Sequence, residues 1–460
     1  MSEHYDAIVI GTGQAGPPLA TRFANSGRKT AIIERKLFGG TCVNVGCVPS
    51  KTLIASARAA HIASHGADFG VMIEGTVRVD MARVRARKNA VVKESSDGLL
   101  KWLKGTPNLT IIEGHSRFIG DHVISVNGMI LEAPQIFINV GGRPLIPALP
   151  GLPEIEYLTS SSIMDLDTLP AHLLIVGGSY IGLEFAQMYR RFGSQVTVVE
   201  AGPHLIARED DEVSLAIQHI LENEGVEFRL NAKNLRVAAA GKAISLHAEC
   251  DGSKVEITGS HVLLAVGRLP NTGDLGLEKA GIKTDPRGFI VVDDQLATSV
   301  PGIYALGDAN GRGAFTHTAY NDHEIVAANL LDGQTRRVSD RIPAYALYTD
   351  PPLGRVGMSE REARASGRKI LVGKMPMTRV GRARERGETQ GFMQVLVDAE
   401  TQKIIGAALL GIEADEVVHS ILNVMYADAS CTVIKRSMPI HPTVSELIPT
   451  LLGGLKPLQA

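Results

Sequence analysis

Two glycine-rich turns, each following a short apolar stretch, are the feature that most constrains the fold of this 460-residue chain. Residues 6–10 predict a strand that ends in the turn 11–16, after which a helical stretch and a second strand lead to Glu34. Another apolar strand leads in the same way into the turn 177–182, and the strand that follows ends on Glu200. In both units the acid lies 18 positions after the last glycine. One such turn is weak evidence, but two complete βαβ units predict two dinucleotide-binding sites.

The predicted fold class is α/β, with two Rossmann-like dinucleotide-binding domains and an α+β C-terminal dimerisation domain. The proline-rich stretch 143–153 indicates a crossover out of the first domain, which we place at residues 1–150. The second domain then covers residues 151–270. Residues 271–340 contain one more strand and complete the first domain, and residues 341–460 form an interface domain without a dinucleotide motif.

The last third of the chain has a different pattern from the two glycine-turn units. Strands are expected within 389–410, a helix at 413–428 and a closing segment at 440–454. No low-complexity tract or long linker interrupts this stretch. A mixed arrangement of this kind, with no nucleotide turn, indicates a surface for subunit contact.

Charge and composition exclude several classes of function. The formal net charge is -2 with both signs interspersed, which indicates neither nucleic-acid binding nor attraction to an anionic membrane. No uncharged apolar run reaches the roughly 18 residues that a membrane-spanning helix needs. We expect no cleaved signal peptide and a cytoplasmic location. Four cysteines do not make a disulfide scaffold, and the isolated Cys250 and Cys431 are expected to be small apolar filling.

Cys42 and Cys47 lie five positions apart in the segment GGTCVNVGCVPSK, residues 39–51. In a regular α-helix such residues have Cα atoms roughly 8.6 Å apart, whereas a disulfide tolerates at most about 7 Å. The pair can therefore bridge only through a distortion, which Gly46 is placed to allow, and a regular helix is expected from about Pro49. Two alternatives remain beside a redox-active pair. One is a metal site, for which two thiolates alone are too few ligands, and the other is two unrelated buried cysteines.

This segment resembles the active-site segment of the class I pyridine nucleotide–disulfide oxidoreductases, which include dihydrolipoyl dehydrogenase, glutathione reductase and mercuric reductase. Further motifs of that family follow in its order. They are GTGQAG with Glu34, GGSYIGLE with Glu200, AVGRLPNT at 265–272, GIYALGDAN at 302–310 and IHPTVSE at 440–446. The resemblance covers essentially the whole chain. It implies FAD in the first domain, with the disulfide on one face of the flavin and a nicotinamide cofactor on the other.

The resemblance assigns most residues of the two glycine turns to cofactor binding. Glu34 and Glu200 would accept hydrogen bonds from ribose hydroxyls, and a 2′-phosphate would meet the negative Glu200, so NADH is expected over NADPH. Asp308 is expected at the ribityl chain, Ser116 at the adenine and Tyr180 over the nicotinamide pocket. No resident metal is expected. The cofactor-binding residues are Gly11, Gly13, Gly16, Glu34, Gly40, Thr41, Lys51, Ser116, Gly141, Asp308, Gly177, Ser179, Tyr180, Ile181, Gly182, Glu200 and Gly267.

The resemblance also gives the two cysteines unequal roles. Cys47 is implied to lie nearer the flavin, and Cys42 is the interchange thiol that attacks the substrate disulfide. Lys51 and Glu184 are implied to pair near the flavin N5, where a cation stabilises negative charge on the reduced ring.

His441 and Glu446 complete the implied catalytic set. The acid would orient the imidazole, and the pair would come from the other subunit of a homodimer, so that the active site is shared. His441 would take a proton from the substrate thiol or Cys42 and return it. The cationic His441 and the local helix N-terminus are expected to depress the thiolate pKa.

The electron acceptor is the least constrained part of this hypothesis. The cysteine segment most resembles mercuric reductases and their relatives, but no cysteine follows Cys431, whereas mercuric reductases carry a C-terminal vicinal pair. A small disulfide or related acceptor is therefore expected. Dihydrolipoyl dehydrogenase is the leading specific alternative, and a metal-ion reductase acting on Hg or Cu is a third. From another class, the chain would be a non-catalytic redox-sensing flavoprotein.

Overall fold

The computed structural model describes residues 2–459, and its first unit is built on a parallel sheet of five strands. Their order is β19 (Ile303–Ala305), β8 (Gln135–Ile138), β2 (Ala7–Ile10), β3 (Thr30–Glu34) and β4 (Leu109–Glu113). Helices α1 (Gly16–Asn25) and α7 (Thr316–Leu331) pack against it. A four-stranded sheet flanks it, in the order β1 (Ser2–His4), β7 (Met129–Glu132), β6 (Val123–Val126) and β5 (Ser116–Gly120). The first predicted βαβ unit is confirmed, because β2 and β3 are parallel neighbours on either side of α1 in sequence.

The second unit repeats this plan. Its parallel sheet has the order β10 (Leu158–Thr159), β17 (His261–Leu264), β11 (His172–Val176), β12 (Gln195–Val199) and β13 (Val226–Arg229). It carries helices α5 (Tyr180–Phe192) and α6 (Asp211–Asn223) and an antiparallel sheet of β14 (Lys233–Ala240), β15 (Ala243–Cys250) and β16 (Ser253–Gly259). The chain leaves the first unit at β9 (Gly142–Pro144) and returns at β18 (Arg268–Pro270), and these two strands pair with each other. The α/β fold with two Rossmann-like units is thus confirmed.

The third unit is an antiparallel sheet of six strands. Its order is β20 (Ala344–Leu347), β21 (Leu353–Gly357), β24 (Ile404–Leu410), β23 (Phe392–Asp398), β22 (Ile370–Pro376) and β25 (Lys456–Pro457). Its helices are α8 (Glu360–Ala365), α9 (Gly381–Glu385), α10 (Ala414–Tyr426), α11 (Thr432–Lys435) and α12 (Ile448–Gly453). The expected strands within 389–410 and the expected helix are confirmed, whereas β20 to β22 come from a stretch without a predicted element. Between residues 2 and 459, no helix has both the length and the apolar composition that a membrane crossing requires.

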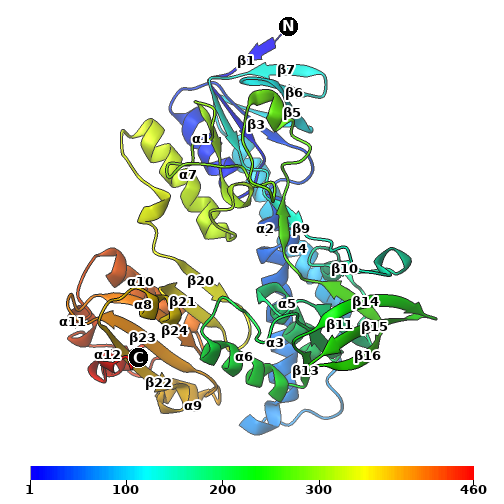
Figure 1. The fold of residues 1–460 in the computed structure, drawn as a ribbon, viewed down its shortest axis with the longest axis vertical. Coiled ribbons are helices and arrows are strands. Elements are labelled where there is room, and N and C mark those ends of the chain that lie inside the picture. Colours follow the sequence, from blue (N-terminus) through cyan, green and yellow to red (C-terminus); the bar gives the residue numbers. More distant parts are fainter. Residues whose placement is uncertain (1, 460) are drawn as a thin grey trace.

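Three helices connect these units. The helices α2 (Gly40–Val45), α3 (Cys47–Ser64) and α4 (Met81–Lys104) leave the first unit, and α3 extends to lie beside α5 of the second (Figure 1). One apolar core contains Leu53 of α3, Leu183 and Phe185 of α5, and Leu347 and Leu353 of the third unit, all of them buried. Burial of this shared core holds the start of α3, and with it the cysteines, at the junction of the three units.

Candidate active site

A cavity of about 1400 Å³ lies at this junction and is lined by all three units. Most residues that the sequence singled out contribute to its walls. Those lining it are Gly11, Gly13, Glu34, Gly40, Thr41, Cys42, Cys47, Lys51, Ser116, Gly141, Tyr180, Ile181, Glu184 and Asp308. The predicted residues outside its lining are Gly16, Gly177, Ser179, Gly182, Glu200, Gly267, His441 and Glu446.

The first glycine turn is in direct contact with the cysteine segment. A Cβ on Gly40 would lie 2.9 Å from a Cα of this turn, and a Cβ on Gly11 would lie 2.3 Å from the carbonyl oxygen of Asn139. The Glu34 carboxylate stabilises the turn. Its Oε2 accepts one hydrogen bond of 3.0 Å from the backbone N of Thr12 and another of 2.5 Å from Thr12 Oγ1. The backbone N–H groups of Gly11, Thr12 and Gly16 bond within the chain, whereas those of residues 13–15, at the start of α1, are open to a pyrophosphate.

The second glycine turn is braced in the same way. Glu200 accepts a hydrogen bond of 2.6 Å from the backbone N of Gly178 and one of 2.8 Å from the backbone N of Gly202. A Cβ on Gly182 would lie 2.0 Å from the carbonyl oxygen of Gly177, so only glycine fits there. A carboxylate has about four lone-pair positions, so Glu200 retains capacity to accept ribose hydroxyls.

The helix that carries the two cysteines breaks at Gly46. The helix α2 ends at Val45 and α3 begins at Cys47, while Gly46 has φ −139° and ψ −120°. A Cβ there would lie 2.8 Å from the carbonyl oxygen of Thr41, so the close approach requires glycine. The predicted distortion is confirmed. The regular helix starts two residues before the expected Pro49, because Gly46 alone takes up the whole distortion.

The two cysteines are thiols in this structure, and they ionise unequally. The pKa of Cys47 is lowered to about 6, first by its hydrogen bond with Cys42 and, against burial, by the Thr316 hydroxyl and the Lys51 charge. The pKa of Cys42 is raised, first by the same contact with Cys47 and then by burial. Cys47 is therefore the thiolate of the pair at neutral pH, and Cys42 retains its proton.

Thr316 was not predicted from the sequence, and its hydroxyl oxygen lies 3.2 Å from Cys47 Sγ. We expect Thr316→Val to raise the pKa of Cys47 by about one unit or more, because a hydrogen bond to a charged group contributes roughly 1.5–3 kcal/mol. The measurement is the pH dependence of alkylation of the reduced enzyme, whose midpoint should move up from about 6. Thr316→Ser retains the hydroxyl and should leave the midpoint in place. An unshifted midpoint in the Thr316→Val variant would show that the Thr316 hydroxyl does not stabilise the Cys47 thiolate.

Lys51 and Glu184 form the ion pair that the resemblance implied. Lys51 Nζ lies 2.7 Å from Glu184 Oε2 at the wall of the cavity. The second carboxylate oxygen accepts a hydrogen bond of 3.1 Å from the backbone N of Tyr348, whose ring centroid lies 4.5 Å from Lys51 Nζ. Tyr348 was not predicted, and it contacts both members of the pair.

Tyr180 at the cavity wall is tied to a buried carboxylate. Its hydroxyl and that of Tyr345 both donate to Glu209 Oε1, at 2.8 Å and 2.7 Å. Glu209 is fully buried, with Arg355 Nη1 3.8 Å from its other oxygen. Burial and the Glu209 charge raise the pKa of both tyrosines, so both are neutral donors. The sequence indicated Tyr180 but not the residues that hold it.

His441 and Glu446 form a dyad outside this cavity. His441 Nδ1 lies 2.8 Å from Glu446 Oε2, and the imidazole is 80% exposed while the carboxylate is 12% exposed. The nearby Met438 and Ile440 are 94% and 78% exposed. Exposed apolar residues of this kind around an oriented histidine are typical of a protein interface.

Comparison with known protein families identifies the family of this chain. Residues 5–322 match the pyridine nucleotide-disulphide oxidoreductases, and residues 343–452 match the dimerisation domain of the same family. The chain belongs to the pyridine nucleotide-disulphide oxidoreductase family. It is a flavoprotein and an NAD(P)H-dependent disulfide oxidoreductase, and the matched dimerisation domain supports a homodimer.

Relatives within this family differ in the acceptors that their names indicate. The chain is 35% identical to the probable pyridine nucleotide-disulfide oxidoreductase RclA of Escherichia coli, over 98% of this chain and 99% of that one. It is 35% identical to the dihydrolipoyl dehydrogenase of Thermus scotoductus (96% and 95% covered) and 33% identical to a mercuric reductase of Staphylococcus aureus (90% and 76%). A solved structure of a Cu(II) complex of RclA, described as an HOCl-induced flavoprotein disulfide reductase, superposes with a TM-score of 0.90 at 34% identity, covering 98% and 99% of the two chains.

The residues of the cavity fit the FAD that this family binds. The bare first glycine turn offers backbone N–H groups to a pyrophosphate, and Gly114, His115 and Ser116 line the same cavity beyond it. Burial raises the pKa of Asp308, whose Oδ2 lies 3.5 Å from Arg268 Nη2. A partly buried carboxyl with one cation beside it has capacity left for the hydroxyls of a ribityl chain.

Proposed function

We propose that this enzyme passes electrons from NADH through FAD to the Cys42–Cys47 pair, and from that pair to a small disulfide. The observation that carries this proposal is the cysteine pair itself. One thiol with a pKa lowered to about 6 lies beside a second, protonated thiol at the wall of the cavity that the Lys51–Glu184 pair also lines. Bound FAD supplies the hydride acceptor for the nicotinamide and returns the two electrons to the disulfide.

The cysteines exchange disulfides with the acceptor in two steps. Cys42 loses its proton and attacks one sulfur of the acceptor, whose S–S bond breaks and whose other sulfur leaves as a thiolate and is protonated. The Cys47 thiolate then attacks Cys42 in the mixed disulfide, which releases the second acceptor thiol and forms the Cys42–Cys47 disulfide. The acceptor gains two electrons and two protons. The cysteine pair supplies both electrons and the Cys42 proton, and the second proton comes from solvent.

Cys42 needs a base for the first step because the neighbouring Cys47 raises its pKa. Within residues 2–459, the oriented imidazole of His441 is exposed and does not line the cavity of its own chain. We propose that His441 of the second subunit serves as this base, held by Glu446. We also propose that residues 1–150 and 271–340 hold FAD, residues 151–270 hold the nicotinamide cofactor and residues 341–460 form the interface.

Glu200 supports a preference for NADH. Its carboxylate lies at the end of β12 beside the second glycine turn, where a 2′-phosphate would meet its negative charge. We expect kcat/KM for NADH to exceed that for NADPH by about ten-fold or more, which corresponds to roughly 1.4 kcal/mol of repulsion. Steady-state kinetics with both cofactors tests this, and equal or better use of NADPH would contradict it.

The acceptor is tested by anaerobic reduction of the holoenzyme with NADH, followed by addition of lipoamide, glutathione disulfide, other small disulfides, Hg(II) or Cu(II). Fast reoxidation by one disulfide would identify the acceptor. Reoxidation by none of the disulfides would overturn the proposal.

A second candidate acceptor is Cu(II), because the RclA structure with which this chain superposes over 98% of its length is a Cu(II) complex. Two Cu(II) ions would each accept one electron from the Cys42 thiol and Cys47 thiolate, which become the disulfide and release the Cys42 proton. Thiolate is a preferred ligand of reduced copper, and the cysteine pair provides one at neutral pH. Production of two Cu(I) per NADH, measured with a Cu(I) chelator, distinguishes this candidate from disulfide reduction.

A further inference from the structure

Residues 348–352 connect β20 to β21 and reach from the third unit to α3 and α5. Tyr348 of this loop contacts both members of the Lys51–Glu184 pair. Its backbone N donates a hydrogen bond to Glu184, and its ring packs against Lys51 Nζ. The position of the pair therefore depends on what holds this loop in place.

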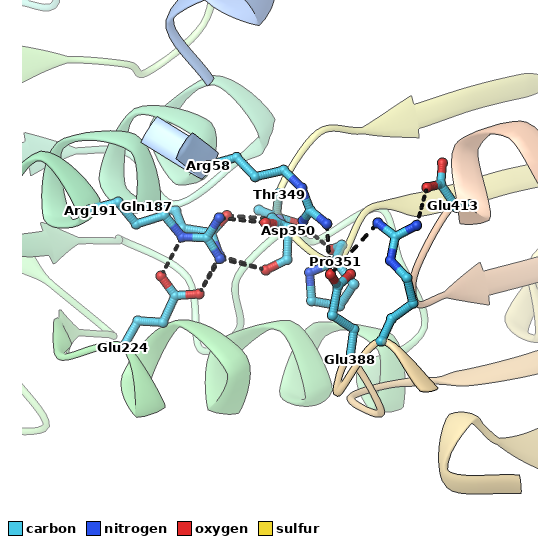
Figure 2. Close-up of polar contacts among 10 residues, drawn as sticks. Arg58, Gln187, Arg191, Glu224, Thr349, Asp350, Pro351, Glu388 and Glu413 are labelled. Atoms are coloured by element: carbon cyan, nitrogen blue, oxygen red, sulfur yellow. Dashed lines mark hydrogen bonds and ion pairs between the residues drawn. The ribbon is translucent and has the colours of Figure 1, made fainter. Parts of the chain in front are cut away.

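Asp350 is the residue that holds the loop, and all of its polar atoms are engaged (Figure 2). Its Oδ1 accepts a hydrogen bond of 2.5 Å from Arg58 Nη1 on α3, and its Oδ2 accepts one of 2.5 Å from Arg191 Nη1 on α5. Its backbone N donates to Gln187 Oε1 and its carbonyl oxygen accepts from Gln187 Nε2, both at 2.7 Å. One residue of the third unit is thus bound by side chains of both helices.

The residues that anchor Asp350 lie on the same helix faces as the ion pair. Arg58 follows Lys51 by seven positions on α3, and Gln187 and Arg191 follow Glu184 by three and seven positions on α5. Such spacings place side chains in one row along a helix. The loop therefore lies along one face of each helix. Tyr348 contacts the ion pair, and Asp350 contacts Arg58, Gln187 and Arg191.

Each arginine that binds Asp350 also pairs with a second carboxylate. Arg191 is 6% exposed and lies between Asp350 and Glu224, which is 2.7 Å from its Nη2, while Arg58 lies between Asp350 and Glu388. Burial alone would raise the pKa of Asp350, but Arg191 and Arg58 lower it below the ordinary value, so this carboxylate is ionised at neutral pH. Removal of its charge leaves two arginines undercompensated in a largely buried position.

We propose that Asp350 is a positioning residue for the Lys51–Glu184 pair, acting through Tyr348. Asp350 is the only charged residue of the loop 348–352, so loss of its charge removes both ion pairs of the loop with α3 and α5 and lets Tyr348 shift from the Lys51–Glu184 pair. The proposal rests on the proposed place of that pair at the flavin. It adds a residue of the third unit to the set that tunes electron entry.

The test is Asp350→Asn in the FAD-loaded enzyme, without any acceptor. We expect the rate constant of flavin reduction by NADH to fall about ten-fold or more, since small misplacements of reacting groups cost 10–100-fold. The reduction potential of the bound flavin, measured by dye equilibration, should shift as well. Glu388→Gln is the matched control. It breaks the other ion pair of Arg58 without touching the loop, and it should leave both readouts unchanged.

Two further variants separate positioning from a general loss of structure. Tyr348→Ala should slow flavin reduction, and the Asp350→Asn/Tyr348→Ala double variant should be no slower than the slower single variant, because both act through one contact. Gln187→Ala removes the two hydrogen bonds between Gln187 and the Asp350 backbone and leaves the ion pairs of Asp350 and Glu224 with Arg191 in place. It provides the test if Asp350→Asn does not fold. Additive effects, or equal effects of Asp350→Asn and Glu388→Gln, would overturn the proposal.

Lys51→Met distinguishes failure of this proposal from failure of the proposed function. Unchanged flavin reduction and potential in Lys51→Met would remove the ion pair from electron entry. If Lys51→Met changes flavin reduction and potential but Asp350→Asn does not, the ion pair keeps its role in electron entry and only the proposed role of Asp350 is refuted. Absence of disulfide turnover in the wild type would overturn the proposed acceptor and leave these acceptor-free measurements standing.

Discussion

Cys42→Ser is expected to lower disulfide reduction by at least about 1000-fold while NADH still reduces the bound flavin close to the wild-type rate. A serine hydroxyl cannot form a mixed disulfide or close a bridge to Cys47, so the electrons have no path to the acceptor. In the proposed scheme, electron entry depends instead on the glycine turns and on Lys51 and Glu184, none of which this substitution changes. Stopped-flow flavin reduction and steady-state turnover with the identified disulfide measure the two halves separately.

Cys250→Ser provides the control for this variant. Cys250 is buried on β15 in the antiparallel sheet of the second unit, and it does not line the cavity. Its replacement should leave both half-reactions intact. Full disulfide turnover by Cys42→Ser would show that another nucleophile serves the acceptor, and the exchange steps proposed for this pair would then be wrong.

The sequence predicted the parts of this molecule that depend on local spacing. The two βαβ units follow from strand, turn and acid at fixed intervals, and the break at Gly46 follows from helix geometry if Cys42 and Cys47 form a bridging pair. Ion pairing of Lys51 with Glu184, 133 positions apart, came from family resemblance, since no local pattern joins them. The same holds for the dyad of His441 and Glu446, whose proposed role depends on a second subunit.

Residues whose roles arise only from packing between units were missed. Thr316 reaches Cys47 across 269 positions, and Asp350 reaches Arg58 across 292. Neither the start of α7, which carries Thr316, nor the loop 348–352 carries a dinucleotide-type glycine turn or a periodicity that marks these residues, although Thr316 follows closely on the GIYALGDAN motif. The cause of the lowered Cys47 pKa was also incomplete in the sequence-based interpretation, because Cys42, Thr316 and Lys51 lower it within one chain.

His441→Gln is expected to lower disulfide reduction by about 100–10,000-fold, the range in which a positioned general acid–base contributes, with flavin reduction by NADH retained. Glutamine matches the polar shape of the imidazole but cannot take the proton of Cys42. Loss of activity alone does not tell which subunit supplies the histidine. The exposed position of His441, outside the cavity of its own chain, makes that question decidable.

A mixed dimer of one Cys42→Ser chain and one His441→Gln chain decides it. If each active site combines Cys42 of one subunit with His441 of the other, one of the two sites regains both intact residues while the other loses both. Heterodimers isolated through two different affinity tags should then recover about half of the wild-type turnover, although each parent homodimer is nearly inactive. If both residues served within one chain, each site of the mixed dimer would lack one of them and no activity would return. Recovery would therefore establish a shared site, and its absence from a stable heterodimer would refute the proposed role of the second subunit.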